Sequence, residues 1–177
     1  MRNPRAILLV MLPLLLVSGC RNPFAPRLGD PQGVWSDQTT VGGLLENFRM
    51  AYIRQDSLRY ADCLSCDAYT FNYFDTEMAE YASMPREQDL AATGRLFRHY
   101  DSVDLRWVGI SGTVAELETP DSLISFTVFF VLTLDATWID GHARFSVIRR
   151  TDEGEGCGSG PAGDEPVFRV VQWDDNL

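Results

Sequence analysis

The chain has 177 residues, of which 45% are hydrophobic and 11% aromatic, so it can build a buried core and is not a disordered tail. Its 15 basic and 25 acidic residues give a formal net charge of −10. This acidity argues against binding to nucleic acid or to an anionic lipid surface, because both require a basic face.

The first 19 residues are predicted to be a signal peptide. Arg2 and Arg5 form a basic start without acidic residues, the apolar run 6–17 follows, and two small residues come before a cysteine. The run is shorter than the ~20 residues of a membrane-spanning helix, and Pro13 interrupts it. An exported precursor therefore explains this segment better than a transmembrane helix does.

The motif Val17-Ser18-Gly19-Cys20 resembles the lipobox of bacterial lipoproteins. The resemblance implies a diacylglycerol thioether on Cys20, cleavage before that residue, and acylation of the new amine by a fatty acid such as palmitate. Arg21 stands where the inner-membrane retention signal has Asp, so the expected location is the cell envelope, on the outer membrane facing the periplasm. The alternative is an ordinary secretory signal with a coincidental cysteine.

Residues 20–39 are predicted to be a lipidated tether, because they contain several prolines and glycines and show no apolar periodicity. The folded domain is then expected over residues 40–177, which is a single-domain length. Between 41 and 55, apolar residues recur at helical spacing behind a possible N-cap at Thr40. A short helix capped by Asp56 or Ser57 should follow.

The remaining elements are one more helix and five strands. An aromatic strand is predicted over 69–74 and a third helix over about 85–98. From there the period changes to two, which predicts a four-stranded antiparallel meander with strands near 105–117, 124–136, 142–150 and 167–173. Asp140-Gly141 is a two-residue hairpin signal between the second and third of these strands. The order indicates an α+β domain.

Three stretches resemble the NTF2-like superfamily, the cystatin-like α+β roll that includes SnoaL-type cyclases and ketosteroid isomerases. They are residues 44–60, 70–74 and 168–175. The resemblance implies an NTF2-like cone over about residues 40–175, with three N-terminal helices packed on a curved antiparallel sheet and a cavity at the open end. A different curved antiparallel sheet with helices on one face is the alternative.

The resemblance implies a cavity whose candidate lining residues are Tyr52, Tyr69, Tyr73, Trp107 and Asp135. Ketosteroid isomerases place acidic, His or Tyr residues in an apolar interior that tunes their pKa values. No residue matches a catalytic motif, since neither of the two histidines has a serine or cysteine at a recognisable spacing. We therefore assign no catalytic residue.

Cys63-Leu64-Ser65-Cys66 is a C-x-x-C sequence. A thioredoxin-like site requires the first cysteine at a helix N-terminus, where the helix dipole lowers its pKa, whereas this pair ends a predicted helix. The expected role is structural, as small core residues or as a local disulfide between Cys63 and Cys66. A zinc site would need further ligands at close spacing, so no metal and no cofactor are expected.

Three functional hypotheses remain. The first is a membrane-anchored, non-catalytic lipoprotein that binds a protein partner or a small apolar ligand. The second is a pocket enzyme of the isomerase or cyclase type, which requires a buried ionisable group with a shifted pKa. The third is a purely structural or assembly lipoprotein with a filled cone. In it, Phe129 and Val131 on the outer sheet face would support a homodimer.

Overall fold

The structure is a computed structural model that describes residues 35–112, 123–150 and 166–176. The predicted signal peptide and Cys20 lie outside the described residues. Within the described ranges, no helix is long and apolar enough to cross a membrane.

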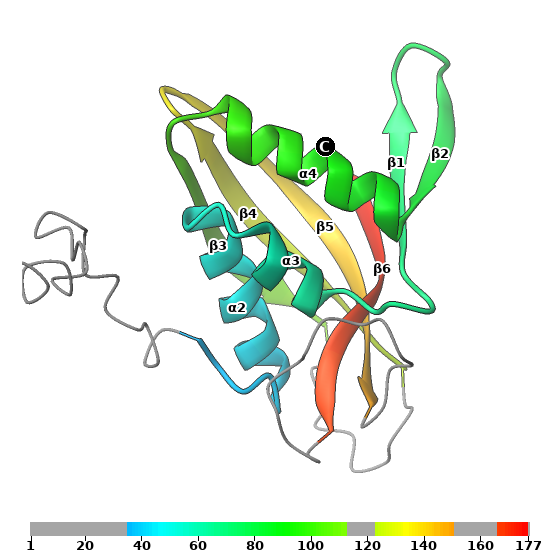
Figure 1. Cartoon of the computed structure of the whole chain (residues 1–177). Helices are drawn as coiled ribbons and strands as arrows, with labels where there is room; N and C mark the ends of the chain where they lie inside the picture. The colour runs from blue at the N-terminus through cyan, green and yellow to red at the C-terminus, as the bar shows by residue number, and fades with distance from the viewer. Residues whose placement is uncertain (1–34, 113–122, 151–165, 177) are drawn as a thin grey trace, which may run out of the picture. The chain divides into compact units, whose positions relative to one another are not determined.

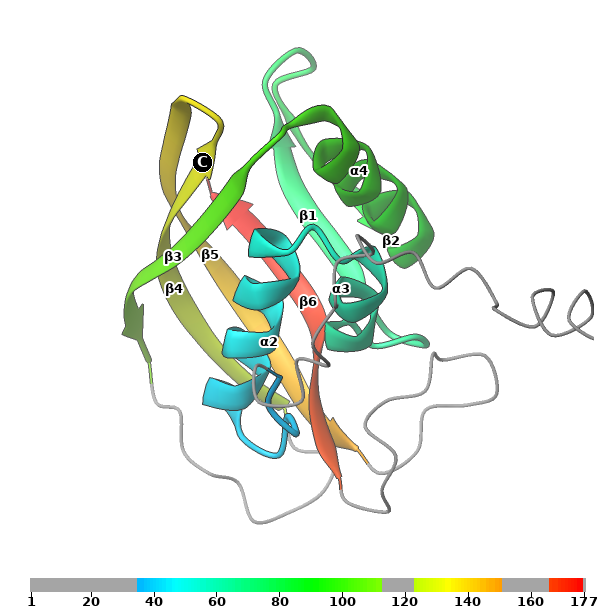
Figure 2. The same cartoon turned by 60° about the vertical axis from the view of Figure 1, so that its left-hand side comes forward.

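One curved six-stranded sheet carries three helices on one face (Figures 1 and 2). The helices are α2 (Val41–Ile53), α3 (Ser57–Cys63) and α4 (Arg86–His99). The strands are β1 (Thr70–Asp75), β2 (Glu80–Pro85), β3 (Val103–Ser111), β4 (Leu123–Leu134), β5 (Thr137–Arg150) and β6 (Val167–Asn176), in the spatial order β2-β1-β6-β5-β4-β3. Strands β3 to β6 form the predicted antiparallel meander, and β1 pairs with β6 in parallel. The α+β class is confirmed.

The sequence led us to expect three N-terminal helices, but the structure places only two of the described helices before the sheet. Helices α2 and α3 come before the sheet, but α4 lies between β2 and β3 in the chain. Strand β2 was not predicted either. Among the described strands it pairs with β1 alone, at the edge of the sheet, and it is largely exposed. An exposed edge strand does not need the apolar alternation from which strands are recognised in a sequence.

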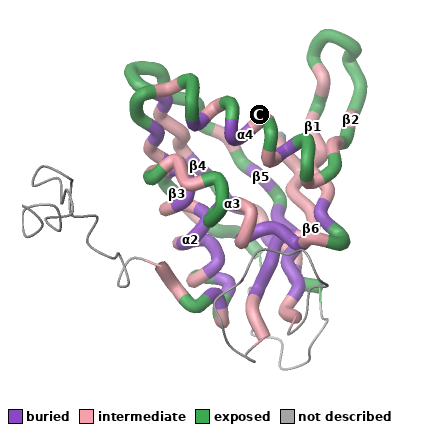
Figure 3. Tube along the Cα trace, viewed as in Figure 1, coloured by how far each residue is buried: buried purple, intermediate pink, exposed green. Residues whose placement is uncertain are grey.

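Burial follows the period-two pattern of β4. Ile124, Phe126, Val128 and Phe130 alternate with more exposed neighbours and face the helices. On α2, Leu44 and Phe48 belong to the same buried core. Figure 3 shows buried segments in purple on α2 and along the central strands. At ~25 cal/mol per Å² of apolar surface, this burial is the main force that holds the helices on the sheet.

The turn between β4 and β5 is not at Asp140-Gly141, as predicted, but at residues 135–136. Asp135 has a φ of 51°, a left-handed conformation that Asp tolerates better than most residues. Its N–H donates to the Ser102 carbonyl oxygen at 3.0 Å, and its Oδ1 accepts from the Ser102 N–H at 2.8 Å. Because these hydrogen bonds to Ser102 fix Asp135, the turn forms at residues 135–136. Gly141 is therefore an ordinary strand residue of β5 and pairs with Phe130.

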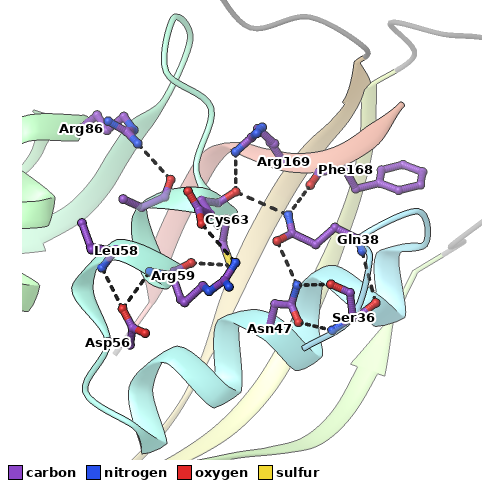
Figure 4. Close-up of polar contacts among 12 residues, drawn as sticks. Ser36, Gln38, Asn47, Asp56, Leu58, Arg59, Cys63, Arg86, Phe168 and Arg169 are labelled. Atoms are coloured by element: carbon purple, nitrogen blue, oxygen red, sulfur yellow. Dashed lines mark hydrogen bonds and ion pairs between the residues drawn. The ribbon is translucent and has the colours of Figure 1, made fainter. Parts of the chain in front are cut away.

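The last residues of the predicted tether belong to the folded domain (Figure 4). Gln38 is only 2% exposed, and its Nε2 donates to the Phe168 carbonyl oxygen at 3.0 Å. The Phe168 N–H donates back to the Gln38 carbonyl oxygen at 2.9 Å, and Asn47 Nδ2 donates to Gln38 Oε1 at 3.0 Å. The segment thus covers the edge of β6 beyond the end of β1. Ser36 and Gln38 are thus held by hydrogen bonds to α2 and β6.

Candidate functional site

A cavity of about 240 Å³ lies between the helices and the sheet. Its walls come from α2, α4 and all six strands, so residues far apart in the sequence meet there. Its volume falls just below the ~300–1,000 Å³ that is typical of sites for drug-sized ligands. The cavity therefore suits a small molecule.

Aromatic side chains make up much of the wall: Phe48, Tyr52, Phe71, Trp107, Phe130, Phe145 and Trp173. Phe48 is central among them, with ring centroids 5.5 Å from both Phe145 and Trp173. Trp107 is held in place because its Nε1 donates to the Leu45 carbonyl oxygen at 2.9 Å. All of these rings except Phe130 thus form one connected set, fixed by ring contacts and by this hydrogen bond.

One carboxylate of the wall, that of Asp89, is held by two tyrosines. Asp89 lies in the first turn of α4 and is 5% exposed. Its Oδ2 accepts from Tyr60 Oη at 2.6 Å and from Tyr69 Oη at 2.9 Å. Burial raises the pKa of Asp89, and the hydrogen bonds from Tyr60, Tyr69 and Thr93 partly oppose that rise.

The three tyrosines around Asp89 remain neutral donors. Burial raises the pKa of Tyr52, Tyr60 and Tyr69, and the neighbouring Asp89 charge raises each of them further. Their phenols stay protonated at neutral pH, because the ordinary Tyr pKa is already about 10. Tyr60 and Tyr69 can therefore donate to Asp89 across the physiological range.

Strand β6 adds a second carboxylate to the wall. Trp173 and Asp175 are two residues apart on one face of the strand, and both line the cavity. Trp173 Nε1 is buried and has no hydrogen-bond partner among the described residues. A buried donor without an acceptor is uncommon in native structures and often marks the place of a water or a ligand.

The predicted pocket residues divide into three groups. Tyr52 and Trp107 line the cavity. Tyr69 does not line the cavity, but its hydroxyl donates a hydrogen bond to Asp89, and Asp89 does line the cavity. Tyr73 and Asp135 do not line it: Tyr73 stacks on Phe71 with ring centroids 5.7 Å apart, and Asp135 lies in the β4–β5 turn.

Sequence reasoning missed Asp89, because acidic residues in a first helical turn are explained by the helix dipole alone. A signal was present. Asp89, Thr93 and Phe97 are four residues apart and share a face of α4, and all three are buried. An acidic residue on the apolar face of a helix indicates a buried polar network.

The structure contradicts a disulfide between Cys63 and Cys66. Cys63 is a free, buried thiol, and burial raises its pKa far above the ordinary value. Cys66 is disulfide-bonded, and the other two cysteines, Cys20 and Cys157, lie outside the described residues. Among described side chains, no group of three or more His, Cys, Asp or Glu is arranged to hold a metal.

Large apolar side chains are exposed on the strands at the β3 side of the sheet. Val108 is 67% exposed, Phe129 44% and Trp138 66%. Val131, predicted to share this surface, is half-buried. Phe129 is not isolated, because its ring lies 5.9 Å from the ring of His142 on β5.

No family model matches the chain, and no curated protein matches it. A protein from Kribbella flavida is similar in structure with a TM-score of 0.51 at 13% identity, over 79% of this chain and 89% of that one. An NTF2-like protein from Shewanella baltica OS155 gives a TM-score of 0.49 at 11% identity, over 75% and 86%. One from Silicibacter pomeroyi DSS-3 gives 0.47 at 12% identity, over 77% and 92%. At such identities a likeness concerns the fold alone.

Proposed function

We propose that this protein is a lipid-anchored lipoprotein of the cell envelope whose NTF2-like domain binds a small, largely apolar ligand. The observation that carries the binding function is the cavity of about 240 Å³, with aromatic walls and a few inward-facing polar groups. That combination is typical of small-molecule sites. The anchor rests on the basic start, the apolar run and the lipobox resemblance of residues 1–20. A purely structural role is less well supported, because it requires a filled cone.

Two neighbouring alanines of α4 provide a matched test. Ala92 lines the cavity, whereas Ala91 is exposed on the same helix. A92F should fill the cavity and weaken binding of an environment-sensitive apolar dye at least about tenfold, because the ligand and the new ring compete for the same volume. A91F should leave dye affinity unchanged. Equal dye binding by both variants and the wild type would contradict a cavity ligand.

A second candidate is acid–base catalysis of the isomerase or cyclase type. It is favoured by one observation: Asp89 is a buried carboxyl with a raised pKa in an apolar cavity. In that case D89N would abolish turnover of a substrate while ligand binding persisted. Turnover that survives D89N would remove Asp89 as its acid or base.

A further inference from the structure

We propose that the ligand of this cavity is an organic cation, that is, an ammonium group carried on a small apolar body. The inference rests on the proposed function and adds the chemical class of the ligand. It stands on two features of the wall: aromatic rings on several sides, and a buried carboxylate with no cationic neighbour in the described part of the chain.

Aromatic faces attract cations because the ring quadrupole is negative above and below the ring plane. The attraction is strongest for Trp and increases when the cation is desolvated. Seven aromatic residues line this cavity, including Trp107 and Trp173. None of the described residues that line it is Arg, Lys or His, so no side chain of the wall competes for those faces.

The Asp89 carboxylate gives the cation a counter-charge. Both tyrosine hydroxyls donate to the same oxygen of Asp89, which is the arrangement that favours the ionised form. The N-terminal turn of α4 favours a negative charge at the same place. A buried carboxylate is costly unless it is paired, and no salt bridge to Asp89 occurs among the described residues. An ammonium ligand would complete the pair.

The probes are choline and its neutral isostere 3,3-dimethylbutan-1-ol, in which carbon replaces the charged nitrogen. The two have nearly the same shape and the same hydroxyl, so their difference in affinity isolates the charge. Isothermal titration of the mature full-length protein should show choline binding at least about tenfold more tightly than the isostere. Equal affinities would overturn the cation inference and leave the proposed binding function standing.

Two variant pairs locate the effect. D89N should reduce the preference for choline, and E87Q, at an exposed acid of the same turn, should keep it. W107L should weaken choline binding, and W138L, at an exposed ring, should not. Thermal unfolding checks that each variant folds. If D89N does not fold, the Trp pair and the wild-type isostere comparison still decide.

Failure of the two proposals can be told apart. If neither probe binds but the apolar dye does so in an A92F-sensitive way, the cavity has a ligand and the cation assignment is wrong. If the dye also binds equally to A92F and the wild type, both proposals fail.

Discussion

At the scale of single residues, Asp89 connects the core to the cavity. Its carboxylate is buried, it holds Tyr60 and Tyr69 through hydrogen bonds, and it contributes to the cavity wall. Its ionisation is therefore linked both to stability and to any chemistry in the cavity. A group of this kind can be tested without knowing the ligand.

Because burial raises the pKa of Asp89, its contribution to stability is fully present below the ordinary Asp pKa of about 3.9 and is lost as the pH rises through the raised value. D89N cannot ionise. The free energy of unfolding of D89N minus that of the wild type should therefore increase from pH 4 to pH 7. Urea denaturation across that range measures it, and a difference that is constant or decreases with pH would contradict the raised pKa.

The free and bonded cysteines give a second prediction at this scale. Native Cys63 should resist alkylation, because it is buried and its raised pKa leaves almost no thiolate. After denaturation without reduction, Cys63 should be labelled and Cys66 should not. Peptide mass mapping shows which cysteines carry the label. Labelling of Cys66 before reduction would contradict its assignment as disulfide-bonded.

At the scale of elements, the sequence predicted the features that depend on neighbouring residues, such as helix caps and the buried face of a strand. Thr40 was expected to cap α2, and its side chain accepts from the Gly43 N–H at 3.0 Å. The alternation of β4 predicted its buried face correctly. The β4–β5 turn was misplaced because Ser102, more than thirty residues away, holds Asp135. The cavity could be expected only from the family resemblance, since its wall is assembled from distant segments.

The segment before α2 supplies a prediction at this scale. Asn47 is 5% exposed; it accepts from the Ser36 N–H at 2.7 Å and donates to Gln38. N47A should lower the free energy of unfolding by about 1–3 kcal/mol, because buried groups of the segment lose their partners. R54A, at an exposed position after α2, should change it by less than about 0.5 kcal/mol. If urea denaturation gives the same change in the free energy of unfolding for N47A and R54A, the hydrogen bonds of Asn47 do not stabilise the segment before α2.

At the scale of the whole molecule, the described residues offer the cavity and the exposed apolar side chains of β3, β4 and β5 for interaction. For the exposed face of the sheet, the simplest partner is a second copy of this chain, because isologous dimers are the commonest assemblies. Phe129 and Trp138 are the exposed side chains with the largest rings on β4 and β5.

If the sheet face forms a homodimer, F129E should shift the protein from dimer to monomer at micromolar concentration, because a charge would be buried in the contact. L58E changes an exposed apolar residue on α3 and serves as the control. Sedimentation velocity distinguishes the two states. A wild-type protein that is monomeric at all concentrations would contradict the dimer and leave the cavity unaffected.

Whether the cavity holds a ligand is tested most directly by the intact mass of the exported, gently purified protein, compared under native and denaturing conditions. We predict extra mass in the native spectrum that is lost on denaturation and is absent from A92F but retained by A91F. Identical native and denatured masses for the wild type, together with no A92F-sensitive dye binding, would contradict a ligand-binding cavity.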